Sequence, residues 1–463
     1  MRGDANKIMS DSQSDSMSAE DRDRLATLVA DATRRGADAA DAVLIRSTSI
    51  SHAQRLGEIE QLERQESFDL GLRVFRGQKQ AIVSSTDFSR EALAELVGRA
   101  LDMAAAVPDD PWCGLADPDQ LATDIPELDM VDPAEPDSET LIEMARVCED
   151  AARAVDGITN SEGAQASWSR TGVCLAASNG FAGDYARTDT GVGVSVIAGE
   201  GAGMESEYDF AHAVHMEDLE DPADVGRRAG EKAAARLGAR RMPTAQVPVV
   251  FDPRVAGGLL GHLMGAITGP AIARGTSFLK DRLGDQIFAA DIEIIDDPHR
   301  KRGMRSKPFD AEGITNSKRS IVEDGILTTW LLDLASAKQL GLKTTGHAGR
   351  GTSGPPSPGP TNLYLTPGSL SPTELMADIS AGLYITSLMG MGVNGVTGDY
   401  SRGASGFWIE NGEITFPVTE LTIASNLNQM FADMTRANNL EFRYGTNSPT
   451  VRIDGMTVAG GGE

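Results

Sequence analysis

The order of helical and extended patterns is the feature of this sequence that most restricts its fold. A helical pattern that includes Leu25 and Leu28 precedes three extended segments between residues 41 and 87, and a second helical pattern occupies 89–107. The same order of helix, strands and helix recurs within 138–240. Strands that follow one another directly predict antiparallel pairing, because a doubly wound sheet would alternate strand and helix. The sequence therefore predicts an α+β protein with a duplicated helix–strands–helix unit.

Changes in composition divide the chain into five parts. The start is polar and rich in serine and aspartate, and a later segment is rich in proline and acidic residues without hydrophobic periodicity. The last part is rich in glycine and in turn signals. The predicted parts are a disordered tail (1–18), a first α+β unit (19–107), a surface linker (108–137), a second α+β unit (138–240) and a larger, mainly antiparallel C-terminal domain (245–463).

Charge and cysteine content disfavour several classes of function. The chain has 42 Lys and Arg against 68 Asp and Glu, a formal net charge of −26, which disfavours binding to a phosphate backbone. Its three cysteines include no CxxC pair, which disfavours a disulfide framework and indicates a reducing compartment. The sequence has no apolar signal segment and no uncharged apolar run of about 18 residues. We therefore expect a cytoplasmic protein with no nucleic-acid partner and no membrane partner.

Turn and cap signals place several elements of the C-terminal domain. Asp-Gly at 324–325 and Asn-Gly at 411–412 each predict a hairpin turn, and Ser and Glu at 371 and 374 predict a capping box. The segment "GMGVNG" (390–395) matches the GxGxxG pattern of dinucleotide sites. The residues after it are typical of turns and strands, whereas a pyrophosphate requires a following helix. We therefore expect tight turns there and no nucleotide cofactor.

His262 lies in an apolar, glycine-rich segment (257–279) and is the first candidate for a functional residue. Asp252 as N-cap and Pro253 at the first helical position predict that a helix begins just before it. The helix is apolar nearly all round, and glycines recur at every fourth position from 257 to 265, which predicts burial and close approach of another backbone. A zinc-peptidase helix needs a second histidine one turn on and a glutamate, and this helix has neither. Taken alone, His262 is therefore predicted to be a buried, hydrogen-bonded structural residue.

Two serines in glycine-rich loops leave a serine hydrolase open as an alternative. Ser353 lies in "RGTSG" and Ser405 in "RGASG", and neither matches the GxSxG elbow. His347 lies shortly before Ser353 in the sequence. A serine and a histidine within hydrogen-bond reach would supply a nucleophile and its base.

The loop that contains Ser353 also suggests peptide binding. Residues 344–365 are rich in glycine and proline and run into a strand. A peptide could add to the edge of such a strand through main-chain hydrogen bonds, whatever its side chains. We therefore predict Ser353, Asn362 and Tyr364 as peptide-binding residues.

Several blocks of sequence after residue 245 occur together in one order. They include "GTSFLKDRLGDQIF" (275–288), "FDAEGITNSKRSIVEDGILTTWLLDLASAKQLG" (309–341), "PTNLYLTPG" (360–368) and "GLYITSLMGMGVNGVTGDYSRGASGFWIENGEITFPVTELTIASNL" (382–427). In these blocks the chain resembles the TldD/PmbA family, specifically its PmbA (TldE) branch. The resemblance extends over nearly the whole sequence.

The resemblance implies a two-subunit peptidase that acts on unfolded or small peptides. In the family, the TldD-type chain carries an HExxxH helix and a later cysteine ligand, and its partner lacks them. His262 stands near the first of these positions, and the segment 438–455 supplies no cysteine. The resemblance therefore implies a non-metal subunit of a cytoplasmic complex, with no cofactor of its own and with zinc in a TldD-type partner.

Alternatives to this interpretation stay open. When alone, the chain is expected to form at most a homodimer, and the apolar segments 382–393 and 405–410 are candidates for an interface core. The chain could instead be an autonomous hydrolase that uses Ser353 or Ser405 with His347. It could also be a non-catalytic regulator that binds peptides.

Overall fold

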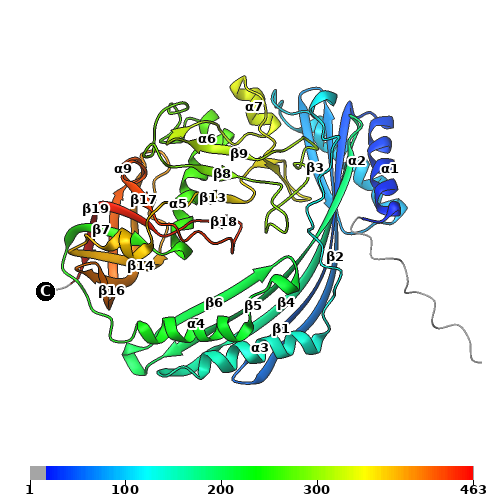
Figure 1. Ribbon diagram of the computed structural model, residues 1–463. Coiled ribbons are helices and arrows are strands. Elements are labelled where there is room, and N and C mark those ends of the chain that lie inside the picture. Colours follow the sequence, from blue (N-terminus) through cyan, green and yellow to red (C-terminus); the bar gives the residue numbers. More distant parts are fainter. Residues whose placement is uncertain (1–16, 462–463) are drawn as a thin grey trace, which may run out of the picture.

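The structure is a computed structural model that describes residues 17–461, with a helix-covered sheet followed by a C-terminal domain (Figure 1). The α+β class that the sequence predicts is confirmed. Two units have the same order of elements. The first contains α1 (Ala19–Arg34), β1 (Ala39–Arg55), β2 (Glu58–Arg76), β3 (Lys79–Ser85) and α2 (Arg90–Ala106). The second contains α3 (Ser138–Arg153), β4 (Ile158–Ala177), β5 (Ala182–Ala198), β6 (Glu205–Ala213) and α4 (Pro222–Ala235).

The first helix begins where a serine caps it. The Oγ atom of Ser18 accepts a hydrogen bond from the backbone N–H of Asp21 (3.1 Å). Met17 is buried and packs against Gly172 in β4. The tail predicted for 1–18 therefore ends two residues too late, because Met17 and Ser18 belong to the folded unit. The remainder of that prediction, 1–16, lies outside the described residues.

The two units share one antiparallel sheet, in the order β3-β2-β1-β4-β5-β6. Their first strands, β1 and β4, pair from Asp41↔Ala177 to Gln54↔Ala164. Helices α1 to α4 cover one face of this sheet (Figure 1). Alternate residues of β1, among them Ala40 and Ile50, point toward this face and pack in the two apolar cores between the sheet and the helices. None of the described helices combines the length and apolar character needed to cross a bilayer.

The predicted linker, 108–137, is held between the shared sheet and the C-terminal domain. All of it is described, and its one regular element is a short 3₁₀ turn, Pro118–Gln120. The carbonyl of Met130 accepts a hydrogen bond from the N–H of Thr188 in β5 (2.9 Å), and the carbonyl of Leu128 accepts one from Arg302 of the C-terminal domain (2.9 Å). The segment therefore connects two layers of the molecule as well as two parts of the sequence.

The C-terminal domain contains a closed five-stranded barrel. Strand β7 pairs in parallel with β14 and antiparallel with β19, and β16 pairs with both β15 and β19, which closes the ring. The elements are β7 (Ala245–Phe251), α5 (Pro253–Ala266), α6 (Gly269–Ala273), β8 (Ile294–Asp296), β9 (Arg319–Glu323), β10 (Ile326–Leu327), α7 (Leu334–Leu340), β11 (Ala348–Gly349), β12 (Ser357–Pro358), β13 (Leu363–Leu365), α8 (Pro372–Met376), β14 (Ala381–Met389), β15 (Asp399–Glu410), β16 (Glu413–Asn426), α9 (Leu427–Ala432), β17 (Met434–Arg436), β18 (Thr446–Asn447) and β19 (Val451–Gly460).

The hairpin turns and the capping box that the sequence predicts for this domain are present in the structure. Asn411 and Gly412 have φ values of 52° and 83° at the β15–β16 turn, and Asp324 and Gly325 have 49° and 78° between β9 and β10. Positive φ at both positions is the geometry of a type I′ hairpin. The capping box at the start of α8 is also present. A second sheet, β10-β9-β8-β13-β18, packs with α5 and the barrel around one apolar core.

A buried ion triad joins the C-terminal domain to the shared sheet. Nη1 of Arg350, in the loop between β11 and β12, lies 2.6 Å from Oδ1 of Asp41 in β1, and Nε of Arg73 in β2 lies 3.0 Å from Oδ2. Burial alone would raise the pKa of Asp41, but the two guanidinium groups outweigh it and hold the pKa below its usual value. The backbone of Thr352 also lies against Gly71 of β2, where a Cβ atom would collide with it.

We expect Asp41→Asn to destabilise the protein by about 3 to 5 kcal/mol, because it leaves two buried guanidinium groups without their counter-charge. Differential scanning calorimetry would measure the loss as a lowered Tm. The control is Glu143→Gln, which breaks an exposed pair with Arg146 on α3 and should leave the Tm unchanged. Equal Tm values for Asp41→Asn and the wild type would show that the triad does not hold the two layers together.

Candidate functional site

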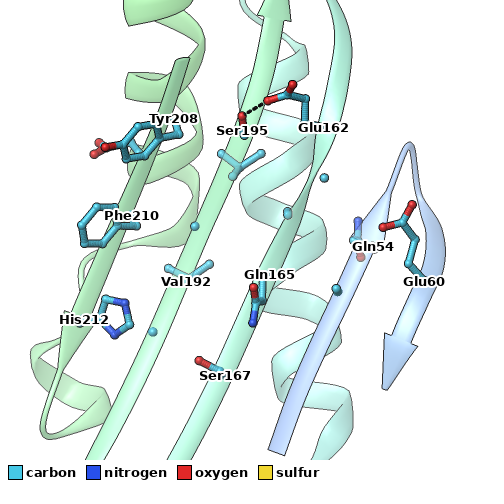
Figure 2. A pocket seen from close by; sticks show the side chains of 17 residues that line it. Gln54, Glu60, Glu162, Gln165, Ser167, Val192, Ser195, Tyr208, Phe210 and His212 are labelled. Atoms are coloured by element: carbon cyan, nitrogen blue, oxygen red, sulfur yellow. Dashed lines mark hydrogen bonds between the residues drawn. The ribbon is translucent and has the colours of Figure 1, made fainter. Parts of the chain in front are cut away.

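A groove of about 510 Å³ lies on the face of the shared sheet that the helices leave open (Figure 2). It crosses β2, β1, β4, β5 and β6, through Glu60, Ala53, Gln165, Gly193 and Phe210 in that order. Ligand sites typically measure about 300 to 1,000 Å³. This groove is not among the sites predicted from the sequence.

The groove is hollow because small residues form its floor. In β5, Val192 and Val194 are buried against α3 and α4, so Gly191 and Gly193 between them face the groove. A Cβ atom added to Gly191 would lie 2.5 Å from Cε1 of His212. The side chains of His212 and Phe210 on β6 therefore occupy the space above Gly191 and Gly193 of β5.

Rings on β6 form one wall of the groove. Tyr208 and Phe210 stack with their centroids 6.1 Å apart, and Phe210 also meets the rings of His212 (5.7 Å) and Tyr444 (5.5 Å). Nδ1 of His212 lies 3.0 Å from Oδ1 of Asp189, and this hydrogen bond raises the pKa of His212 against the opposing effect of burial. The wall is thus aromatic, with an ionisable pair at one end.

His262 occupies a different pocket, of about 320 Å³, between α5 and β15. Its ring is half-buried and meets the ring of Tyr400 edge-on, with centroids 5.8 Å apart. Burial and the charge of Arg402 both lower the pKa of His262. Within the described residues no hydrogen bond to its ring is present, so the predicted buried, hydrogen-bonded histidine is corrected to a half-buried one that lines a pocket.

The glycines of α5 do not have the role that the sequence predicts for them. No atom lies within 4 Å of the place where a Cβ would stand on Gly261 or Gly265, and Gly257 alone of the three has a neighbouring backbone, the carbonyl of Thr446 at 3.4 Å. The side of the helix with Gly261 and Gly265 therefore has no neighbouring element packed against it, and the other side, with Leu259, is buried in the core.

The residues around His262 do not fit a zinc ion. A catalytic zinc needs three protein ligands, and the next turn of α5 offers Gly265 and Ala266. The nearby charge is the guanidinium of Arg402, which would repel a cation. Over residues 17–461, no group of three His, Cys, Asp or Glu side chains is arranged to hold a metal ion.

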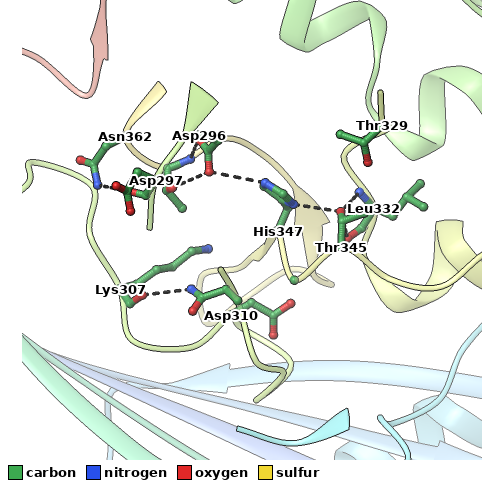
Figure 3. A network of polar contacts seen from close by, with 12 residues as sticks. Asp296, Asp297, Lys307, Asp310, Thr329, Leu332, Thr345, His347 and Asn362 are labelled. Carbon is green, nitrogen blue, oxygen red and sulfur yellow. Dashed lines mark hydrogen bonds and ion pairs between the residues drawn. The ribbon is translucent and has the colours of Figure 1, made fainter. Parts of the chain in front are cut away.

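The serine–histidine pair predicted as an alternative is not assembled. His347 is buried; its Nδ1 lies 2.9 Å from Oγ1 of Thr345 and its Nε2 lies 3.4 Å from Oδ2 of Asp296 (Figure 3). Ser353 is exposed in the loop between β11 and β12. Ser405 is buried in β15, and its hydroxyl has no hydrogen-bond partner among the described residues. Neither serine therefore meets the imidazole, which has an acid and a hydroxyl as its neighbours.

The other predicted peptide-binding residues are already engaged. The amide of Asn362 donates to the carbonyl of Asp297 (2.7 Å) and to Oγ of Ser306 (2.8 Å), and it accepts from the N–H of Arg305 (2.8 Å). Tyr364 lies in β13, which pairs with β8 on one side and β18 on the other. This strand has no free edge to which a peptide could add.

A buried acidic pair lies close to the ion triad. Glu312 accepts a hydrogen bond from the N–H of Leu334 (2.8 Å) and lies near Asp310 and Arg73. Burial and the charge of Asp310 raise the pKa of Glu312 to about 8.

A buried lysine lies near the same acidic pair. Nζ of Lys307 donates a hydrogen bond to the carbonyl of Ala348 (2.8 Å), and burial lowers the pKa of Lys307.

Three family models match most of the chain. They describe PmbA/TldA metallopeptidase domain 1 (residues 40–104), the central domain (131–237) and the C-terminal domain (244–460). Metalloprotease PmbA of Escherichia coli O157:H7 is 41% identical over 426 residues, which cover 91% of this chain and 92% of the relative. The metalloprotease PmbA homolog of Haemophilus influenzae is 38% identical over 435 residues, 93% and 94% of the two chains. The chain belongs to the PmbA/TldD metallopeptidase family.

Solved structures share the fold over nearly the whole chain. A crystal structure from Bacteroides thetaiotaomicron has a TM-score of 0.88 and 26% identity, and the match covers 96% of this chain and 99% of that one. TldE from Thermococcus kodakarensis has a TM-score of 0.84 and 20% identity, with 94% and 100% covered. At that identity the likeness to TldE shows the fold alone.

We expect His262→Gln to keep the fold and to lower stability by about 0.5 to 1.5 kcal/mol, the usual worth of an edge-to-face ring contact. Urea unfolding would measure the change, and elemental analysis would measure zinc in both proteins. Stoichiometric zinc in the wild type that is lost in His262→Gln would show that the histidine is a metal ligand.

We expect Glu312→Gln to flatten the dependence of stability on pH. The carboxyl has a pKa of about 8 in the folded protein, whereas the ordinary pKa of a glutamate is 4.5. Between these values the folded state holds a proton that the unfolded chain has released, so wild-type stability falls as the pH rises from about 5 to 8. The amide does not titrate, so the variant should gain about 2 to 4 kcal/mol relative to the wild type across this range. Tm measured from pH 5 to 8, with exposed Glu323→Gln as control, tests this; identical slopes for all three proteins would contradict it.

Proposed function

We propose that this chain is the non-metal subunit of a cytoplasmic peptidase complex that acts on unfolded or small peptides, with the catalytic zinc held by a TldD-type partner. The observation that carries the proposal is the environment of His262. A single imidazole beside the guanidinium of Arg402 replaces the ligand set that a metallopeptidase helix requires. The family and the metalloprotease relatives support the peptidase assignment.

An exposed apolar surface beside α5 supports a role as a subunit. Met389, Met391 and Val396, at and beyond the end of β14, are 54%, 92% and 56% exposed. Met391 lines the His262 pocket together with Gly261 and Gly265 of α5, and Met389 and Val396 lie within five residues of Met391 in the sequence. Contiguous exposed apolar residues are typical of protein–protein contact sites. The other candidate interface segment, 405–410, contributes Trp408 and Ile409 to the interior.

The serine hydrolase alternative has less support, because His347 and the two serines are not in contact. A non-catalytic regulator that binds peptides is the second candidate, and the sheet groove favours it as much as it favours a subunit of an enzyme. The two differ in one property. A subunit restores hydrolysis when its partner is present, whereas a regulator lowers or leaves unchanged the activity of that partner.

We expect the purified chain to be inactive on peptides, to form at most a homodimer, and to support chelator-sensitive hydrolysis when mixed with a TldD-type chain. Light scattering coupled to size exclusion would measure the oligomeric state, and a peptide assay with and without the TldD-type chain would measure hydrolysis. Met391→Asp should weaken the complex at least tenfold, and Met204→Asp, an equally apolar exposed residue next to β6, should not. Robust hydrolysis by this chain alone would overturn the proposal.

A further inference from the structure

The groove on the open face of the shared sheet has an unbalanced charge. Its lining residues, all within the described chain, include Glu60, Glu162 and Asp209 and no lysine or arginine. Asp209 is paired with Nε of Arg228 (2.7 Å) and Nζ of Lys232 (3.2 Å), both on α4. Glu60 and Glu162 therefore set the charge of the groove.

The two glutamates are available to a ligand. Glu162 accepts hydrogen bonds from Ser195 and from Ser206 (2.9 Å), both on the same oxygen, Oε2, which leaves Oε1 open (Figure 2). These hydroxyl groups stabilise the carboxylate without neutralising it. Glu60 is exposed on β2, and among the described residues it has no ion-pair partner.

One arginine of the protein, Arg254, lies beside the aromatic wall of the groove, but other groups of the protein already bind it. The guanidinium of Arg254 lies 4.9 Å from the ring centroid of Tyr208. It is bound to the carboxylate of Glu207 (3.0 Å) and to the carbonyl of Tyr208 (3.0 Å). Arg254 shows that this ring accepts a cation on its face, and it leaves the two groove glutamates unpaired.

The length of the groove indicates an extended ligand. It crosses five neighbouring strands, and strands lie about 4.8 Å apart, so its length is about 19 Å. A fully extended peptide rises about 3.3 Å per residue, so about six residues span this distance. The floor of Gly163, Gly191 and Gly193 allows a backbone to lie close to the sheet.

We propose that this groove binds an extended peptide segment that carries lysine or arginine side chains. The ligand class rests on the proposed function, whereas the preference for basic residues follows from the groove itself. The cationic side chains pair with Glu60 and Glu162, and the aromatic wall that includes Phe210 offers an apolar surface to a neighbouring side chain of the peptide. Exposed ion pairs are weak singly, so the two carboxylates must act together for selective binding.

Direct binding to the isolated full-length chain tests the proposal. The probes are three fluorescein-labelled octapeptides in which alanine alternates with lysine, glutamine or glutamate. In fluorescence anisotropy at low salt, the lysine peptide should bind at least tenfold more tightly than the glutamine peptide. The glutamate peptide should show no binding. Equal affinity for the lysine and glutamine peptides would overturn the proposal.

Matched variants locate the site. The double variant Glu60→Gln, Glu162→Gln should lose at least tenfold in affinity for the lysine peptide. Glu58→Gln, on the same strand but outside the groove, should change it less than twofold. Ser167→Trp fills the groove and should abolish binding. Ser169→Trp, two residues further along β4, should not, and circular dichroism would check that both tryptophan variants are folded.

The outcomes separate this inference from the proposed function. Loss of binding to the same degree in Glu58→Gln would show attraction to the net charge and would overturn the proposal. Spermine that binds as tightly as the lysine peptide, with the same response to the variants, would reassign the groove to small polycations. Selective peptide binding without hydrolysis in the presence of a TldD-type chain would overturn the proposed function and leave the groove assignment intact.

Discussion

The pairing of β1 with β4 is the contact on which the rest of the structure depends. Two units, each with three strands, would otherwise have short sheets with an exposed edge at their first strand. Because these edges join, six strands form one curved surface, with helices α1 to α4 on the same side. The face without helices is divided in two. The end near Asp41 contacts the C-terminal domain, and the end near Gly193 forms the groove.

Much of the fold could be predicted from local patterns. One-face apolar spacing, serine and aspartate caps, and Asn-Gly and Asp-Gly turns depend on neighbouring residues, and these elements are where the sequence places them. Closure of the barrel could not be predicted, because β7 pairs with β19 across about 200 residues and no local signal specifies that contact. The ion triad was missed for the same reason: Asp41 and Arg350 are 309 positions apart.

The candidate sites show which chemical signals a sequence carries. The sequence shows that no glutamate and no second histidine follow His262 at the spacing of a metallopeptidase helix, and the prediction of a non-metal subunit rests on this difference. The unpacked side of α5 could not be predicted from the sequence, because glycines at every fourth position occur both in helices that pack closely against another backbone and in helices with an exposed side. The groove had one signal, "GVGVSV" at 191–196, where small residues alternate with valine. Alternation of this kind marks a strand with one buried apolar face and one face of glycine and small side chains.

The long-range closure of the barrel has a consequence for biosynthesis. Strands β1 to β6 and their helices are complete by residue 235, so the sheet can form while later residues are still being translated. Strands β7 and β16 both wait for β19, and until it arrives each has an unsatisfied edge that can pair with another chain. During the interval between the two events these strand edges are exposed, and exposed edges favour aggregation of a nascent chain.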